Sequence, residues 1–216
     1  MQADIYVIEG SEGAGKTTAT RLVIQKLKEK YPHRQVHHLR EPGGSERAEK
    51  IRTEIKEMHT LLEPFQEAIL FKHARKAMAE DNEEMLNDEK NIIVMDRSVI
   101  SSLVYQGILG EVGVDKVLRE NEDVMRLIPI RHAFLLDGSV DVFLKRINDR
   151  EEKDEMYDSA PRKVHEQIIE GYRSLLTNRP SLLKDIPFDR IDAERTPEEI
   201  ATEIVKHITQ GGNKND

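Results

Sequence analysis

A glycine-rich run near the N-terminus carries the clearest chemical signal in the chain. It reads Gly10-Ser11-Glu12-Gly13-Ala14-Gly15-Lys16-Thr17-Thr18 and follows an apolar segment at 5–8. The pattern G-x-x-x-x-G-K-T between a strand and a helix lets backbone N–H groups and a helix N-terminus surround an anion. It predicts a phosphate-binding loop, in which Lys16 would contact the terminal phosphates of a nucleotide and the Thr17 hydroxyl would bind Mg²⁺. A glycine-rich turn without a ligand is the simpler alternative.

Two further groups of polar residues follow predicted strands. Arg40-Glu41-Pro42-Gly43-Gly44 comes after the second strand, and Met95-Asp96-Arg97-Ser98 closes the most apolar one. Because the carboxyl ends of parallel strands meet at one edge of a sheet, both groups would face the phosphate loop. There the Asp96 carboxylate can hold the water shell of Mg²⁺, and the Arg97 guanidinium can grip a phosphate. A strand-to-helix turn and a surface ion pair are the alternatives.

Residues suited to recognising a nucleoside lie in two other segments. Ser101-Ser102-Leu103-Val104-Tyr105-Gln106-Gly107 places hydroxyls, a phenol and an amide close together, as the recognition of a sugar and a base requires. Phe71 and Arg75 are four residues apart on a predicted helix and therefore share a face. Their ring and guanidinium would suit stacking on a nucleobase and hydrogen bonding to it. Capping serines, a partly buried tyrosine and a core phenylalanine are the alternatives.

Strand-like and helix-like segments alternate along the chain, which is typical of a parallel sheet with helices on both faces. The predicted strands are residues 4–8, 35–39, 91–96, 132–137 and 188–192. Predicted helices run from 16 to about 30, from 47 to 59 and from 64 as far as 86, and apolar stripes at helical spacing begin at Val164 and Ile200. The expected fold class is α/β, of the P-loop NTPase type. It has three α/β/α layers, a five-stranded parallel sheet and a lid segment. One domain would span 1–209, with a flexible tail at 210–216.

Composition narrows the classes of function. The formal charge of −8 argues against a nucleic-acid-binding face. The chain has no cysteine, and its eight histidines lack the H-x₃₋₅-H spacing with a second ligand pair, which argues against a structural zinc site. No apolar run approaches the roughly 20 residues of a membrane span, and no signal peptide is evident. We therefore expect a cytoplasmic enzyme with neither a membrane nor a nucleic-acid partner.

Taken together, the three motifs resemble the thymidylate kinase family, whose members phosphorylate dTMP to dTDP. The similarity covers almost the whole chain. It rests on residues 8–18, on Arg40-Glu41-Pro42-Gly43-Gly44, and on Asp96-Arg97 followed by 101–107, in the family's order and spacing. The resemblance implies ATP as phosphoryl donor, Mg²⁺ as cofactor, dTMP as the other substrate and a homodimer.

The resemblance also assigns roles to individual residues. The implied ATP-binding residues are Gly10, Ser11, Glu12, Gly13, Ala14, Gly15, Lys16, Thr17, Thr18, Arg146 and Ala193. The implied dTMP-binding residues are Glu12, Glu41, Pro42, Arg52, Phe71, Arg75, Arg97, Ser101, Ser102, Tyr105 and Gln106. The implied metal contacts are Thr17 and Asp96, and the implied catalytic residues are Lys16, Arg97 and Arg150. Among these, Phe71 would stack on thymine, and Tyr105 would lie against C2′ and disfavour a 2′-hydroxyl.

The lid segment, approximately 146–160, is where the chain departs from the family pattern. Members without an arginine inside the phosphate loop take their transition-state arginine from the lid, and Arg150 is the first candidate here, with Arg146 and Lys153 as alternatives. Glu155-Met156 stands where relatives usually carry Asp-Arg, and Asp158 follows as the lid acid. Two other departures are Ser98, in place of an aromatic residue, and Lys72-His73, in place of small residues.

Three other functions are compatible with a phosphate loop. Another nucleoside or nucleoside-monophosphate kinase would differ only in its acceptor pocket. A GTP-dependent switch protein would carry Asp-x-x-Gly after the third strand, and the sequence has none there. A DNA-handling ATPase would need a basic stripe, which the acidic charge argues against.

Overall fold

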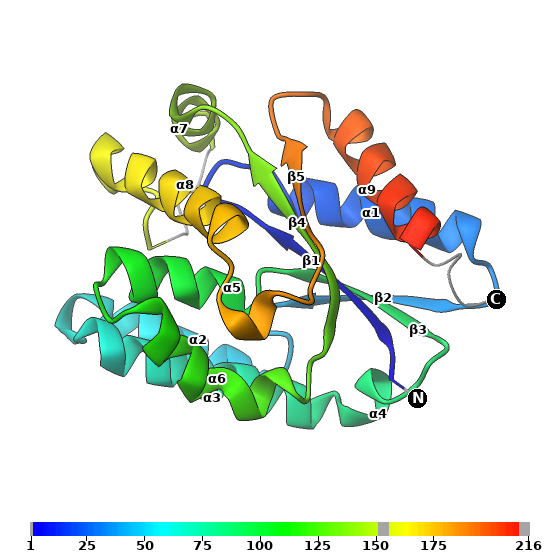
Figure 1. Ribbon diagram of the computed structural model, residues 1–216, viewed down its shortest axis with the longest axis horizontal. Coiled ribbons are helices and arrows are strands. Elements are labelled where there is room, and N and C mark those ends of the chain that lie inside the picture. Colours follow the sequence, from blue (N-terminus) through cyan, green and yellow to red (C-terminus); the bar gives the residue numbers. More distant parts are fainter. Residues whose placement is uncertain (1, 151–155, 212–216) are drawn as a thin grey trace.

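A sheet of five parallel strands forms the centre of the computed structural model, which describes residues 2–150 and 156–211 (Figure 1). The strand order is β2-β3-β1-β4-β5. The strands are β1 (Asp4–Glu9), β2 (Gln35–Arg40), β3 (Asn91–Asp96), β4 (Ile130–Asp137) and β5 (Phe188–Asp192). All five predicted strands are confirmed. β1 and β2 end one residue later than expected, and β4 begins two residues earlier.

Helices connect successive strands and cover both faces of the sheet, so the predicted three-layer α/β/α class is confirmed. The α-helices are α1 (Lys16–Lys30), α2 (Glu46–Met58), α3 (Pro64–Asp81), α4 (Glu83–Leu86), α5 (Val99–Ser102), α6 (Val114–Met125), α7 (Val140–Asn148), α8 (Arg162–Thr177) and α9 (Pro197–Gly211). Short irregular helices are η1 (His59–Leu61), the π-helical η2 (Leu103–Leu109) and η3 (Ser181–Leu183).

Two apolar cores form, one on each face of the sheet. Side chains alternate along a strand, so Ile5 and Val7 of β1 enter one core while Tyr6 and Ile8 enter the other. The first core packs against α2, α3 and α6, and the second against α1 and α9, which lie side by side (Figure 1). The central strands are buried along most of their length, as continuous apolar runs predict.

The expected continuation of α3 to Leu86 is wrong. The helix ends at Asp81, and Asn82 adopts φ −113° and ψ 20° before α4 begins. The Asn82 side-chain amide donates hydrogen bonds to the Met78 and Gly44 carbonyl oxygens, at 2.8 and 3.1 Å. The second bond ties the helix end to the loop after β2, so a contact distant in sequence interrupts the helix.

Two predicted boundaries fall near the ends of the described ranges. Gln210 and Gly211, assigned to the tail, belong to α9, and 212–216 lie outside the described residues. The predicted lid begins inside α7, and its residues 151–155, which include Lys153 and Glu155, also lie outside the described part of the chain. In the part of the chain that the structure describes, no helix combines the length and apolar composition needed to cross a bilayer.

Candidate active site

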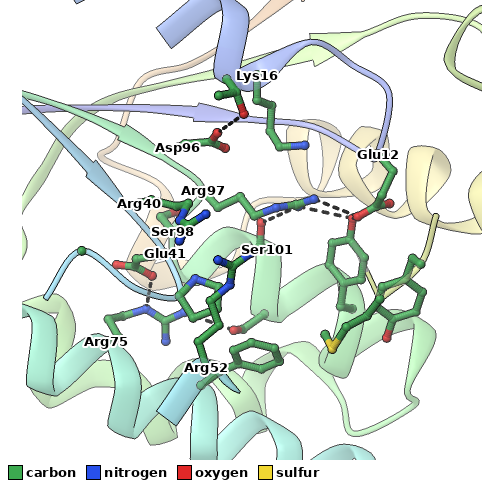
Figure 2. A pocket seen from close by; sticks show the side chains of 18 of the residues that line it. Glu12, Lys16, Arg40, Glu41, Arg52, Arg75, Asp96, Arg97, Ser98 and Ser101 are labelled. Carbon is green, nitrogen blue, oxygen red and sulfur yellow. Dashed lines mark hydrogen bonds and ion pairs between the residues drawn. The ribbon is translucent and has the colours of Figure 1, made fainter. Parts of the chain in front are cut away.

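A cleft of about 650 Å³ lies at the carboxyl ends of β1, β2 and β3, where open α/β sheets bind ligands. In Figure 2, Lys16 and Asp96 lie at one end of it, Glu41 and Arg75 at the other, and Arg97 between them. The predicted site residues that line the cleft are Glu12, Gly15, Lys16, Thr17, Thr18, Glu41, Pro42, Arg52, Phe71, Arg75, Asp96, Arg97, Ser101, Ser102, Tyr105, Gln106 and Arg150.

The other predicted ATP-binding residues do not line the cleft but belong to the phosphate loop or contact it. The Lys16 ammonium donates to the Ser11 carbonyl oxygen at 2.9 Å, and the Gly10 carbonyl oxygen accepts from Arg97 at 3.2 Å. The Arg146 guanidinium donates to the Ala193 carbonyl oxygen at 2.9 Å and to that of Gly13 at 3.5 Å. Through these bonds the loop is tied to α7 and to the segment after β5. Ala14 is buried in the core beneath it.

Glycine is required at position 13 by both conformation and space. Its φ is +76°, a left-handed value that side-chain-bearing residues rarely adopt. A Cβ atom there would lie 2.4 Å from the carbonyl oxygen of Phe143 in α7. The absence of a side chain therefore allows the loop backbone to approach α7 closely.

The candidate metal site joins the phosphate loop to the end of β3. The Thr17 hydroxyl donates to the Asp96 carboxylate at 2.9 Å, and Asp96 is buried. Hydroxyl and carboxylate oxygens are the hard donors that Mg²⁺ prefers, so the residues present fit this cation.

Arg97 occupies the middle of the cleft in a constrained conformation. Its φ is +70°, and its guanidinium donates to the Glu12 carboxylate at 2.8 Å and to the Ser101 hydroxyl at 3.2 Å. The hydroxyls of Tyr105 and Tyr172 accept from the same guanidinium at 3.3 and 3.2 Å. Its position is therefore fixed by the surrounding protein groups.

Glu9 is a functional candidate that the sequence analysis missed. Its carboxylate is fully buried and accepts hydrogen bonds from Ser98 and Ser101 at 2.7 Å each and from Tyr172 at 3.0 Å. Burial raises the pKa of Glu9, although these hydrogen bonds oppose the shift. Ser98, where an aromatic residue was expected from the family pattern, both bonds Glu9 and caps α5. The sequence feature that could have identified Glu9 is its position as an acidic residue at the end of the apolar run of β1.

The end of the cleft opposite the phosphate loop contains a buried polar network and Phe71. The Arg75 guanidinium bonds the Glu41 carboxylate, the Asn121 amide oxygen and, at 3.2 Å, the Ser102 hydroxyl. Burial raises the pKa of Glu41 against the lowering effect of Arg75. Sequence reasoning found Arg75 but missed Asn121, which lies on α6 and becomes its neighbour only through packing.

Gln106 and Glu12, which both line the cleft, each have one buried side-chain oxygen without a hydrogen-bond partner among the described residues. Gln106 donates to Glu67 at 2.7 Å, and its Oε1 atom has no hydrogen-bond partner among the described residues. Glu12 Oε1 accepts from the Tyr105 hydroxyl at 2.6 Å, whereas its Oε2 atom also has no such partner among those residues. Since buried polar atoms are normally satisfied, these two oxygens are available to a ligand.

A further aromatic residue, Tyr157, lines the cleft beside Tyr105. Their ring centroids are 4.9 Å apart, and the His59 ring meets Tyr157 edge-on at 5.4 Å. Met156 also lines the cleft. Because Tyr157 lies in the predicted lid, far from Tyr105 in sequence, periodicity gave no signal for this pair.

Arg150 is the lid cation that lines the cleft in the described part of the chain. Its guanidinium donates to both oxygens of the buried Asp158 carboxylate, at 3.0 and 3.3 Å. The side chain is 38% exposed, so part of the guanidinium remains accessible. The acid two residues beyond Met156 therefore holds the arginine at the cleft.

A phosphate loop, a strand-end carboxylate and an arginine-rich second subsite define the class of P-loop phosphotransferases. Within that class, a family model described as thymidylate kinase matches residues 8–204. The chain therefore belongs to the thymidylate kinase family, and the resemblance read from its motifs is confirmed.

Individual relatives agree with this assignment. The chain is 32% identical over 201 residues to the thymidylate kinase of Staphylococcus haemolyticus, covering 93% of this chain and 94% of the relative. It is 30% identical over 218 residues to that of Bacillus licheniformis, covering 100% and 99%. It is 31% identical over 188 residues to that of Mycoplasma pneumoniae, covering 86% and 88%.

Proposed function

We propose that this protein transfers the γ-phosphoryl group of ATP to a phosphate oxygen of dTMP, giving dTDP and ADP. The observation that carries the proposal is that the phosphate loop and the Arg75 network open into one cleft, with Arg97 between them. Such an arrangement suits two phosphorylated substrates that meet at their phosphates. Membership in the thymidylate kinase family supports dTMP as the acceptor.

On the donor side, the loop residues 10–18 would bind the ATP phosphates, with Lys16 on the terminal ones. Thr17 and Asp96 would hold Mg²⁺, which supplies neutralisation of phosphate charge when bound. Arg146 and Ala193 would lie near the adenine side, since their mutual hydrogen bond positions the loop after β5.

On the acceptor side, the positively charged groups would bind the dTMP phosphate and the polar network the base. Arg97 and Arg52 would contact the phosphate, while Phe71 would stack on thymine. The base edge would be recognised by Arg75 and Gln106, whose buried Oε1 atom would gain a donor from the ligand. The residues that would enclose the remaining sugar and base surface are Glu12, Glu41, Pro42, Ser101, Ser102 and Tyr105.

The transfer would require no general base. The second pKa of a phosphate monoester is about 6, so the attacking oxygen is largely ionised near neutral pH. Catalysis would then consist of alignment and charge neutralisation by Lys16, Arg97 and Arg150. Covering of the cleft by the lid would exclude water, which competes as acceptor.

We also infer that the protein acts as a cytoplasmic homodimer without a nucleic-acid partner. The family resemblance supports the dimer, and the formal charge of −8 opposes attraction to nucleic acid. Sedimentation equilibrium should give twice the chain mass of 24.9 kDa. A monomer over the working concentration range would contradict the dimer.

The deciding experiment measures ADP release with Mg²⁺ and ATP in a coupled assay. The acceptors dTMP, dUMP, UMP, dCMP and GMP are compared with a reaction lacking acceptor. We expect strong turnover with dTMP and weaker turnover with dUMP. Turnover that is independent of acceptor, or that favours another nucleotide, would exclude the thymidylate assignment while leaving the phosphate loop intact.

A further inference from the structure

A cluster of two histidines and an aspartate lies away from the cleft. His132 is near the start of β4, Asp189 is near the start of β5, and His207 lies on α9. The cleft is at the opposite, carboxyl ends of the strands. At about 3.3 Å per residue, His132 lies roughly 17 Å along β4 from its end at Asp137. The proposed kinase function uses none of these three residues.

The sheet register brings the cluster together. Asp189 pairs with Phe134 on the neighbouring strand, and His132 precedes Phe134 by two residues, so all three share one face of the sheet. The His132 ring stacks on Phe134 with centroids 4.3 Å apart, and the His207 ring meets Phe134 at 6.0 Å. Helix α9 thus places His207 over the other two side chains.

Both imidazoles converge on one carboxylate oxygen. His132 Nε2 lies 2.8 Å from Asp189 Oδ2, and His207 Nδ1 lies 2.9 Å from the same atom. The three candidate ligand atoms all lie within 4.8 Å of one another.

We propose that His132, Asp189 and His207 bind a divalent transition-metal ion of the zinc, cobalt or nickel type. A tetrahedral ion with bonds of about 2.0–2.1 Å sets its ligand atoms about 3.3 Å apart, so the two hydrogen bonds would open by a few tenths of an ångström. Asp189 and His207, which are 41% and 36% exposed, have room for this shift, whereas the His132 side chain is only 14% exposed and would keep its position.

The donor set determines which cations would bind. Two imidazole nitrogens and a carboxylate favour zinc-like ions, whereas Mg²⁺ prefers oxygen ligands throughout. The chain has no cysteine, so no thiolate site competes for the metal. Bound metal would join β4, β5 and α9 in a single cross-link. Because α9 packs against α1, the helix that follows the phosphate loop, the ion would stabilise that layer of the fold.

The test uses the full-length protein, freed of metal by a chelator and without nucleotide, in excess Mg²⁺. Zinc titration by calorimetry, cobalt absorption in the visible region and thermal unfolding with each ion are measured. We expect one zinc per chain, cobalt bands typical of nitrogen and oxygen ligands, a raised melting temperature, and zinc-dependent shifts of the His132 and His207 imidazole NMR signals.

Variants connect the binding to the cluster. D189N and H207Q should each weaken zinc binding by at least about tenfold, because even the loss of a supporting residue outside the ligand set commonly costs that much. H33Q removes an exposed histidine between α1 and β2 and should bind zinc as the wild type does. D96N should also bind normally, which separates this site from the metal position in the cleft.

Three outcomes would overturn the proposal. The first is the absence of zinc and cobalt binding in the wild type. The second is binding that D189N and H207Q leave unchanged. The third concerns the melting temperature. If D189N lowers the melting temperature equally with and without zinc, the cluster is a hydrogen-bonded His–Asp–His contact and not a metal site.

Discussion

The protein groups around Arg97 hold its side chain in one position, as the proposed phosphoryl transfer would require. Its backbone is held at φ +70°, and its guanidinium already contacts Glu12, the Gly10 carbonyl oxygen and three hydroxyls. A cation fixed in this way needs little reorganisation when phosphates arrive, which is the condition for efficient electrostatic stabilisation. The other cleft residues form two groups. Residues of the first group would neutralise phosphate charge, and residues of the second group would set the shape of the pocket.

Arg150 belongs to the first group. We expect R150A to lower kcat by about 100- to 1,000-fold, the usual effect of removing one donor to a transition-state charge, with little change in dTMP affinity. Steady-state kinetics and calorimetric dTMP binding measure the two effects. R162A is the control, because Arg162 is an exposed arginine that pairs with Asp141 and Glu166 on the surface. Wild-type turnover in R150A would exclude the proposed role.

Tyr105 belongs to the second group. Since dUMP and UMP differ only in the 2′-hydroxyl, we expect Y105A to reduce the preference for dUMP over UMP, by up to about 100-fold in kcat/KM. Y105F keeps the ring but loses the hydroxyl that bonds Glu12 and Arg97. It should therefore keep the sugar preference while turning over more slowly. An unchanged preference in Y105A would show that the ring does not select the sugar.

Glu9 predicts a pH dependence of stability. Burial raises the pKa of its carboxyl above 4.5, so the folded protein keeps this proton to higher pH than the unfolded chain does. The stability that depends on neutral Glu9 is present below about pH 4.5 and is lost as the pH rises through the folded-state pKa. The unfolding free energy of the wild type minus that of E9Q should therefore fall as the pH rises above 4.5. Urea unfolding measures this difference, and a flat difference would contradict the prediction.

Among the helices and strands, those whose limits depend on neighbouring residues in the sequence could be predicted. The strands are continuous apolar runs, and α1 begins and ends where the phosphate loop and Pro32 set its limits. The end of α3 depends instead on the bond between Asn82 and Gly44, and the π-helix over Leu103–Leu109 has no periodic signature. Such features arise from partners distant in sequence.

The candidate site divides in the same way. Its motif residues were predicted because residue type and spacing alone indicate phosphate and nucleoside binding. Their partners Glu9, Asn121 and Tyr157 were missed. Only the packing of the fold brings these residues into contact with Ser98, Arg75 and Tyr105, respectively. A sequence thus reports the groups that touch a ligand more readily than the groups that hold them in place.

Two glycines supply a matched pair of substitutions, one in the loop between β1 and α1 and the other directly before α6. Gly13 and Gly113 both have positive φ, at +76° and +93°, but a Cβ on Gly113 has nothing within 4 Å. We expect G113A to cost about 1–3 kcal/mol through backbone strain alone. G13A adds a clash with the Phe143 carbonyl oxygen and should cost more than about 4 kcal/mol. Denaturant unfolding compares the two, and equal costs would show that the contact with α7 is easily relieved.

On the scale of the whole molecule, the sheet separates the groups that hold the two proposed substrates. Ala14, Ala19, Phe143 and Ala193, around the phosphate loop, belong to the core shared with α1 and α9. Tyr105 and Tyr172, around the acceptor subsite, belong to the core shared with α2, α3 and α6. Strand β1 contributes alternate side chains to both.

Because the two cores lie on opposite faces of the sheet, the proposed acceptor subsite can change in evolution or in the laboratory separately from the phosphate loop. Substitutions that reshape the acceptor subsite repack one core and leave the packing beneath the phosphate loop untouched, so their effects on the two sides should be nearly additive. A new acceptor preference can therefore be selected step by step while the capacity to use the same phosphoryl donor is inherited intact.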